Sequence, residues 1–258
     1  MTPADFVFET LQTLEVLTNP VTTKETAHKQ YEYHQLTAPK GVHLLFTFFP
    51  FSLQDKIFQT GEAPSASIVY NTLQKYVEKI GIIDLHAPPT VPWVQDGLAS
   101  GGLNLLSMTD CLIKEAIERY ELDNPIVLSP DEGGQIRTGT QGLSKSRTNS
   151  FSVEVHGEVD VKNREVILID DFTKSGSTLI KSKQAFLQQG AKRVISCVTH
   201  LMPLRETGES RLEQLVTKLN GEFLASNTIY THLLEKTPNL KASCLPIIED
   251  FLKMTDEK

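Results

Sequence analysis

The sequence is poor in the features that mark secreted, disulfide-stabilised or membrane proteins. Its 258 residues include only three cysteines, an odd number without a CxxC pair, which argues against a disulfide framework and a structural zinc site. The opening stretch MTPADFVFETLQTLEVL lacks the basic start of a signal peptide. No apolar run approaches the roughly 20 residues that span a bilayer. We therefore expect a cytoplasmic protein with no membrane partner.

Positive charge is also scarce. There are 25 Lys and Arg residues against 32 Asp and Glu residues, which gives a net charge of −7. Nucleic-acid binding depends on a basic surface, so we expect no nucleic-acid partner. A phosphorylated ligand must then be held by a local site. The composition is otherwise that of a globular protein, with 40% hydrophobic and 22% charged residues, and the length allows one large domain or two ordinary ones.

Short apolar runs alternate with amphipathic stretches along the chain. We expect strands at 43–49, 80–85, 125–129, 165–170, 193–199, 222–226 and 242–245. We expect helices at 4–17, 67–79, 105–120, 175–189, 204–220 and 246–254. This alternation predicts an α/β protein with mostly parallel sheets flanked by helices, in which ligands lie beyond the carboxyl ends of the strands.

Three segments fall outside this alternation. Residues 20–40 are polar without clear periodicity and predict an irregular segment. Residues 138–150 are small, polar and basic, which predicts a mobile loop. Residues 153–161 are expected to form a hairpin around His156, Gly157 and Glu158. A domain boundary is expected near 120–124, giving domains 1–122 and 123–258.

The stretch EVILIDDFTKSGSTL, residues 165–179, is the most informative. A strand delivers Asp170 and Asp171, a loop of small hydroxyl residues follows, and a helix then begins. Backbone N–H groups, hydroxyls and the positive end of a helix dipole suit a phosphate monoester, and Gly176 allows close approach of the backbone. The two acids can accept hydrogen bonds from ribose hydroxyls or face Mg²⁺. The same hydroxyl residues are also ordinary helix caps, so the stretch alone leaves both interpretations open.

This stretch resembles the signature of phosphoribosyltransferases that binds 5-phosphoribosyl-1-diphosphate (PRPP). The resemblance implies that Asp170 and Asp171 hold the ribose hydroxyls. It also implies that the 5′-phosphate is held by the loop that follows, namely Lys174, Ser175, Gly176, Ser177 and Thr178. Lys174 stands where an acid or Thr is common, and Ser177 where Gly is common.

Further segments resemble the ribose-phosphate diphosphokinase (PRPP synthetase) family, in the family's order, over about residues 41–250. They are D-L-H-A at 84–87, S-P-D-E-G-G at 129–134, K-S-R at 145–147, T-H at 199–200 and S-N-T-I at 226–229. By residue type alone, a histidine such as His86 is usually structural, and a basic pair such as Lys145 and Arg147 is by default a solvated loop. Asp131 is as readily a helix cap as a site residue. The resemblance favours a functional role for all four.

The family implies roles for these residues. His86 and Asp131 would position Mg–ATP, with Asp170 as a further metal ligand, and Mg²⁺ would be the cofactor. Lys145 and Arg147 would stabilise the transferring diphosphoryl group. Gln54 and Asp55 would lie near the nucleotide. Two phosphoribosyltransferase-like domains and a homo-oligomer are also implied.

The sequence departs from the family on the nucleotide side. Leu53 replaces an arginine of the A-R-Q-D segment, P-I-S-A-K is only partly present at 64–67, and an early adenine-contacting segment has no counterpart. We therefore expect a first domain that is shortened at its N-terminus.

The expected reaction moves the β,γ-diphosphate of ATP to ribose-5-phosphate or a related ribosyl phosphate such as ADP-ribose. The alternatives are a PRPP-consuming phosphoribosyltransferase and a non-catalytic regulatory relative.

Overall fold

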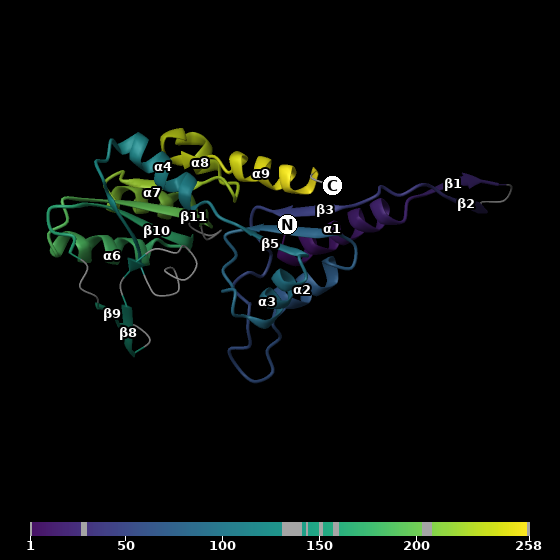
Figure 1. Cartoon of the computed structure of the whole chain (residues 1–258), viewed down its shortest axis with the longest axis horizontal. Helices are drawn as coiled ribbons and strands as arrows, with labels where there is room; N and C mark the ends of the chain where they lie inside the picture. The colour runs from purple at the N-terminus through teal and green to yellow at the C-terminus, as the bar shows by residue number, and fades with distance from the viewer. Residues whose placement is uncertain are drawn as a thin grey trace. The chain divides into compact units, whose positions relative to one another are not determined.

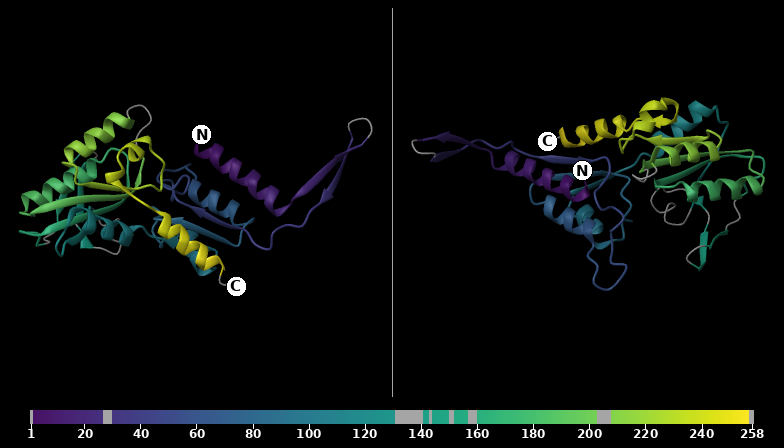
Figure 2. Two further views of the ribbon diagram at one scale, coloured as in Figure 1. Left: turned by 90° about the horizontal axis from the view of Figure 1, so that it is seen from above. Right: turned by 180° about the vertical axis from the view of Figure 1, so that it is seen from behind.

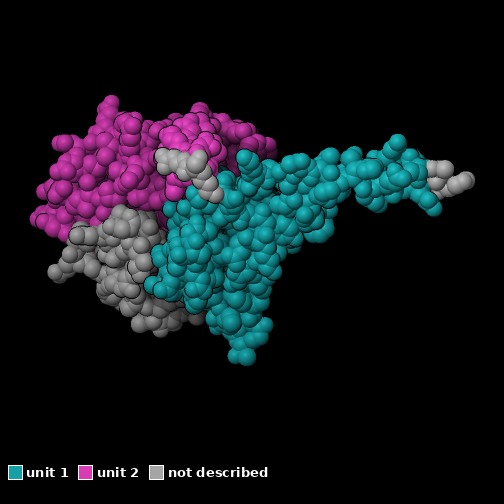
Figure 3. Space-filling view, turned by 45° about the vertical axis from the view of Figure 1, so that its right-hand side comes forward, with its two compact units in different colours: residues 1–82, 89–105, 258 teal, residues 83–88, 106–257 magenta. Residues whose placement is uncertain are grey.

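A computed structural model describes residues 2–26, 30–130, 141–142, 144–149, 152–156, 160–202 and 208–256. Its contacts divide the chain into two compact units (Figure 3). Unit 1 comprises residues 1–82, 89–105 and 258, and unit 2 comprises residues 83–88 and 106–257. Among the described residues, every helix is too short or too polar to cross a bilayer.

Unit 2 contains a six-stranded parallel sheet (Figure 1). In chain order its strands are β6 (Ile126–Ser129), β7 (Gln141–Gly142), β10 (Glu165–Thr173), β11 (Arg193–Leu201), β12 (Phe223–Ser226) and β13 (Lys241–Ala242). They lie in the order β13-β12-β11-β10-β6-β7, and each neighbouring pair is parallel. The carboxyl ends of β6, β10, β11 and β12 therefore meet at one edge of the sheet.

Helices cover both faces of this sheet. They are α4 (Thr109–Tyr120), α6 (Ser177–Gln188), α7 (Gly208–Lys218), α8 (His232–Lys236), the 3₁₀ helix η2 (Pro238–Leu240) and α9 (Leu245–Asp256). In the two further views, α4 and α6 lie on opposite faces (Figure 2). Phe186 of α6 and Leu215 of α7 pack with Val194 and Val198 of β11 in one buried cluster. This double cover explains why β10 and β11 are apolar along most of their length.

Unit 1 is built around a three-stranded sheet of order β3-β4-β5, in which β3 and β4 are parallel. In chain order its elements are α1 (Pro3–Thr18), β1 (Val21–Glu25), β2 (Tyr31–Gln35), β3 (His43–Phe46), α2 (Ser65–Leu73), β4 (Lys79–Ile83), α3 (Pro92–Ala99) and β5 (Leu103–Leu106). Its core is aromatic, with Phe46 edge-on to Phe49 and Phe49 stacked on Trp93.

The predicted fold class is confirmed, but three predicted segments are wrong. Residues 20–40 contain the antiparallel hairpin β1–β2. Both of its faces are exposed, so it shows no apolar alternation in the sequence. The start of the predicted helix at 105–120 is strand β5 and a turn, and α4 begins at Thr109.

The third correction concerns the segment around residue 150. Strand β8 (Ser144–Asn149) lies inside the stretch 138–150 that was predicted as a mobile loop. It pairs with β9 (Ser152–His156). The predicted hairpin turn was at 156–158; His156 ends β9, and residues 157 and 158 lie outside the described residues. Helices α3 and α8 and strand β5 were not predicted. The predicted boundary between domains 1–122 and 123–258 stays a prediction. The compact units follow a different division, in which residues 106–122 belong to unit 2 and α4 packs on β11 and β12.

A buried ion cluster joins α6 to the sheet of unit 2. Lys183 Nζ donates to Glu222 Oε2 at 2.5 Å and to the Leu219 carbonyl at 2.8 Å, and Arg193 Nε donates to Glu222 Oε1 at 2.7 Å. Burial lowers the pKa of Lys183, and the Glu222 carboxylate opposes that shift. One carboxylate thus compensates two cations.

Replacing Glu222 by glutamine is expected to lower the free energy of unfolding by about 3 kcal/mol, because it leaves the buried Lys183 charge uncompensated. Equilibrium urea unfolding measures this as a lower midpoint with an unchanged m-value. Lys192→Ala is the matched control. Its ion pair with Glu165 is exposed on the lysine side, so a change below about 1 kcal/mol is expected. If both variants lose the same free energy of unfolding, Glu222 does not compensate a buried charge on Lys183.

Candidate functional site

Strand β10 carries two buried carboxylates to the carboxyl edge of the six-stranded sheet. Asp170 is 6% exposed and Asp171 is 3% exposed. The Asp171 N–H donates to Asp170 Oδ1 at 3.1 Å, which fixes the first carboxylate against its own strand. Buried carboxylates are costly unless they are hydrogen-bonded, so such a pair in the C-terminal half of a strand is a candidate ligand site.

The second carboxylate meets a histidine from a distant part of the chain. His86 Nδ1 donates to Asp171 Oδ2 at 2.7 Å. This bond sets the ring orientation and turns Nε2 away from the carboxylate. Two segments 85 residues apart, D-L-H-A and the D-D loop, therefore meet at one point of unit 2.

The histidine follows a strained turn. Asp84 has φ +39°, in the left-handed region that residues other than glycine rarely adopt. Its Oδ2 accepts from the Met108 N–H at 3.0 Å and from Thr199 Oγ1 at 2.6 Å, and its own N–H donates to the Leu106 carbonyl at 2.8 Å. These three bonds hold the turn two residues before His86.

A second histidine contacts the backbone of the same turn. His200 is 3% exposed, and its Nε2 lies 3.1 Å from the carbonyls of both Ile83 and Asp84. Because carbonyls only accept, Nε2 carries the proton. Burial lowers the pKa of His200, although the nearby Asp84 carboxylate opposes the shift. The ring is thus neutral, and its Nδ1 accepts from Thr228 Oγ1 at 2.9 Å.

Asp84→Ala is expected to lower the free energy of unfolding by about 3 kcal/mol. Alanine tolerates the left-handed backbone less well than Asp, and two buried donors lose a charged acceptor. Asp84→Asn is the control, since asparagine tolerates this φ and keeps a side-chain oxygen, and we expect about half the loss. Thermal unfolding of the two variants checks the order. An alanine variant as stable as the asparagine variant would rule out the strained-turn account.

A tight loop joins β10 to α6. Thr173 Oγ1 accepts from the Gly176 N–H at 2.9 Å, and Ser175 Oγ donates to Ser177 Oγ at 3.2 Å. Gly176 has φ +68°, and a Cβ placed there would collide with the side chain of Leu215 on α7. Glycine is thus required at this position for two independent reasons.

The loop is a candidate anion site that is open to solvent. Lys174, Ser175 and Ser177 are exposed, and α6 begins at Ser177 with Gly176 as its N-cap. The N–H groups of the first helical turn have no partner within the helix, and the helix dipole favours negative charge there. Lys174 Nζ lies 5.6 Å from the centre of the Phe172 ring, which keeps a cation beside the loop.

The remaining predicted site residues are not part of this described group. Asp131 lies outside the described residues. Lys145 and Arg147 lie on β8, which is described by its backbone pairing alone. Gln54 and Asp55 belong to unit 1, where Gln54 is exposed and Asp55 is buried. The roles of these five residues stay predictions.

The described residues include only some of the predicted metal ligands. Within the described residues, no group of three or more His, Cys, Asp or Glu side chains could hold a metal ion. Mg²⁺ is commonly bound by one or two carboxylates together with water and substrate phosphates. Asp170 fits that donor set, whereas the predicted partner Asp131 lies outside the described residues.

The sequence analysis did not predict the hydrogen bonds that hold the turn before His86. Asp84 and Thr228 lie in segments that had been singled out, but neither had been assigned a role. The signal was present in the T-H and S-N-T-I segments, whose side chains Thr199, His200 and Thr228 all bond toward the turn at Asp84 or toward one another. Only the three-dimensional structure shows that these segments share one network.

The chain is similar in sequence to known proteins. Residues 134–222 match the family described as "Phosphoribosyl transferase domain". A ribose-phosphate pyrophosphokinase of Thermococcus kodakarensis is 26% identical over 82% of this chain and 71% of its own length. A ribose-phosphate pyrophosphokinase of Methanopyrus kandleri is 28% identical over 61% of this chain, and the match spans only 56% of that relative.

A solved structure shares the fold along the whole chain. The phosphoribosylpyrophosphate synthetase from Mycobacterium smegmatis superposes with a TM-score of 0.65 and 21% identity, covering 99% of this chain and 95% of that chain. At this identity the likeness concerns the fold.

Proposed function

We propose that the chain is a member of the ribose-phosphate pyrophosphokinase family and that it transfers the β,γ-diphosphate of ATP to the C1 hydroxyl of a ribosyl phosphate. The C1 oxygen attacks the β-phosphorus, the bond from that phosphorus to the α,β-bridging oxygen breaks, AMP leaves, and the hydroxyl proton is lost. The observation that carries the proposal is the 2.7 Å contact between His86 and Asp171. It joins the D-L-H-A segment to the ribose-phosphate loop.

The described residues suit the two halves of this reaction. Asp170 and Asp171 offer acceptor oxygens for the ribose hydroxyls, and the loop from Lys174 to Thr178 offers donors for the 5′-phosphate. His86, oriented by Asp171, presents its Nε2 for the ATP phosphates. A ribosyl phosphate held at the loop would thus have its hydroxyls beside the histidine.

Mg²⁺ is part of the proposal. When bound with ATP, it would neutralise charge on the diphosphate that is transferred. Asp170 would hold the ion on the acceptor side, and Asp131 is the proposed partner. His86 orients the ATP phosphates in this account, or serves as a ligand of the same ion.

We propose ribose-5-phosphate or a ribosyl phosphate with a larger 5′ substituent, such as ADP-ribose, as the acceptor. The exposure of Lys174, Ser175 and Ser177 supports the larger acceptor, because a substituent on the phosphate can extend into solvent there. The substitution at Leu53 supports an altered nucleotide side.

AMP release with ATP and Mg²⁺ tests the proposal, with ribose-5-phosphate and ADP-ribose compared as acceptors. AMP formed with either acceptor supports diphosphoryl transfer and identifies the substrate. No AMP with either favours a PRPP-consuming transferase, which would release diphosphate from PRPP, or a non-catalytic relative that binds nucleotide without turnover.

The basic pair on β8 provides a separate prediction. Lys145→Ala and Arg147→Ala are each expected to lower kcat for AMP release by about 10²-fold or more, because each removes a cation proposed to stabilise charge that develops during transfer. Steady-state kinetics at saturating ATP measure the change. Lys114→Ala, an exposed lysine on α4, is the control and should keep the wild-type kcat. If both β8 variants turn over at the wild-type rate, these two residues do not act on the transferred group.

A further inference from the structure

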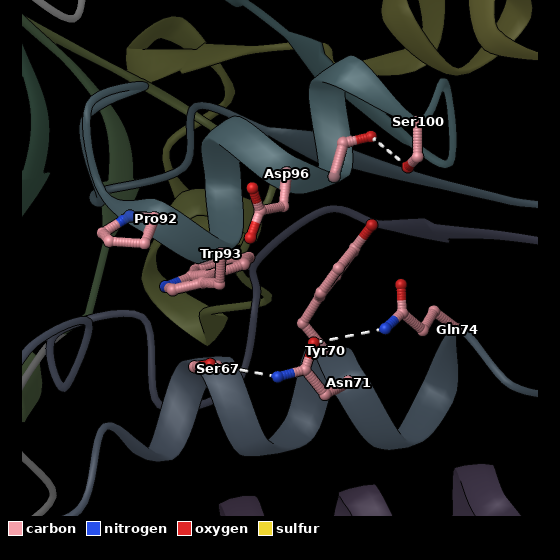
Figure 4. A pocket seen from close by; sticks show the side chains of 9 residues that line it. Ser67, Tyr70, Asn71, Gln74, Pro92, Trp93, Asp96 and Ser100 are labelled. Atoms are coloured by element: carbon pink, nitrogen blue, oxygen red, sulfur yellow. Dashed lines mark hydrogen bonds between the residues drawn. The ribbon is translucent and has the colours of Figure 1, made fainter.

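Unit 1 is open to a partner at the hairpin β1–β2 and not at the pocket between α2 and α3. In that pocket the aromatic side chains Tyr70 and Trp93 are only 1% and 7% exposed, with their ring centres 5.2 Å apart (Figure 4). In the hairpin, by contrast, every residue of both strands is exposed. The hairpin extends away from the sheet β3-β4-β5 of the same unit (Figure 1). Both of its strands are thus accessible along their whole length.

The hairpin lacks the neighbouring strands that usually stabilise a sheet. Within the described part of the chain, β1 and β2 pair only with each other. A two-stranded hairpin on its own is marginally stable in water, and three or more strands are needed for independent stability. The hairpin also exposes large side chains, since Val21 is 52%, Tyr31 53% and Tyr33 71% exposed. Added strands would extend the sheet and bury part of these side chains.

The backbone bonds within the hairpin determine which groups its outer edge offers. The Leu36 N–H donates to the Pro20 carbonyl at 2.8 Å, at the base of the hairpin. Bonded pairs alternate along an antiparallel ladder, so the N–H and C=O groups of His34 and Glu32 are directed at β1. The other backbone groups of β2 are directed at its outer edge. They belong to Tyr31, Tyr33 and Gln35.

Strand β2 is complementary to a second copy of itself. Antiparallel pairing about a two-fold axis at Tyr33 joins Tyr33 to its own counterpart and Tyr31 to Gln35, which are the outward-directed residues. Glu32 and His34 lie on one face of β2, with Oε2 and Nε2 3.9 Å apart, and in this register each faces the other residue type across the axis. An imidazole N–H donates to a carboxylate in either protonation state. An axis at Glu32 would instead place two carboxylates opposite each other, which is destabilising.

The outer edge of β1 offers no such match. An axis at Thr23 would pair Thr22 with Lys24 and Val21 with Glu25, so neither charge would meet its opposite. The acid and histidine of β2 therefore favour its own edge. An unrelated strand would have to supply the same two residue types in the same order, whereas a second copy supplies them by symmetry.

From this register we propose that the outer edge of β2 pairs with β2 of a second copy of the chain, about a two-fold axis at Tyr33. The product is a four-stranded antiparallel sheet of order β1-β2-β2-β1. It reaches the strand number that the single hairpin lacks, and it brings the two Tyr33 side chains together on one face. The contact is independent of the proposed reaction, because all of its residues belong to the hairpin.

Proline substitutions test the edge. Tyr33→Pro removes an outward N–H from each copy and leaves the bonds between β1 and β2 in place. Thr23→Pro is the matched control, since Thr23 lies opposite Tyr33 and its N–H is directed at the outer edge of β1. Sedimentation of the full chain over a range of concentrations measures self-association. We expect Tyr33→Pro to weaken it by about tenfold or more, and Thr23→Pro to change it by less than about twofold.

Cysteine substitutions test the register. Tyr33→Cys places two thiols opposite each other, with Cα atoms about 5.5 Å apart, within reach of a disulfide. Tyr31→Cys is the control, because the two introduced thiols would be roughly 13 Å apart along the paired strands. We expect a covalent dimer on a non-reducing gel for Tyr33→Cys alone. The proposal is overturned if the wild type is monomeric at every concentration, if the two proline variants associate equally, or if the two cysteine variants cross-link equally.

Discussion

His86→Ala is expected to lower kcat for AMP release by about 10²- to 10⁴-fold. The free energy of unfolding is expected to fall by about 1–3 kcal/mol, because the buried Asp171 carboxylate loses a hydrogen-bond partner. The ring is about one-third exposed, so its loss leaves little unfilled volume, whereas the proposed chemistry loses a group directed at the ATP phosphates. Steady-state kinetics at saturating ATP and acceptor give kcat, and urea unfolding gives stability. A variant that retains wild-type kcat would remove His86 from the proposed mechanism.

The contact between His86 and Asp171 makes this prediction more specific. If Asp171 acts partly by orienting the ring, then Asp171→Asn and His86→Ala are not additive in kcat, and the double variant is little slower than His86→Ala alone. Additive losses would instead mean that the two residues act independently on the substrates. His86→Asn, which places an amide near the position of Nδ1, is the conservative variant for comparison.

Gly176→Ala is expected to raise KM for the acceptor by at least tenfold, about 1.4 kcal/mol. The positive φ at this position costs alanine about 1–2 kcal/mol, and the new Cβ collides with Leu215. The loop must shift, and its backbone N–H groups then no longer converge on one phosphate. KM for ATP should change much less, since the loop is proposed to hold the acceptor only.

Gly221→Ala is the matched control for this variant. Gly221 also has a positive φ, +69°, but a Cβ there would meet nothing within 4 Å. The backbone strain is thus similar without the collision, and the residue lies in the turn before β12, at the opposite end of that strand from the ligand edge. We expect Gly221→Ala to lose stability and keep the wild-type KM. An equal rise in acceptor KM for both variants would show that the effect comes from general destabilisation.

Most helices and strands of unit 2 could be predicted from the sequence, but fewer of those in unit 1. The strands β10 and β11 are covered on both faces, so their continuous apolar runs and the helix that follows β10 were predictable from residue type alone. The hairpin β1–β2 was not, because all ten of its residues are exposed and none alternates between core and solvent. Helix α3 was missed for a related reason, since its eight residues include both a proline and a glycine.

The candidate site was predictable as a set of segments and not as a network. Asp170 and Asp171 lie in the last four residues of β10, and His86 lies three residues after β4, in the region where α/β proteins place ligands. Nothing in residue type or spacing indicates that Asp84 adopts a positive φ, or that Thr199, 115 residues away, donates to its carboxylate. Such long-range contacts depend on the packing of the whole unit.

The most direct test of the central claim is product analysis of a reaction containing the protein, Mg²⁺, ATP and a ribosyl phosphate. Phosphorus NMR follows all phosphates at once. The account predicts AMP and a C1-diphosphorylated acceptor in equal amounts, with neither formed by His86→Ala. ADP and free phosphate in place of AMP, or AMP formed at the same rate without an acceptor, would contradict diphosphoryl transfer.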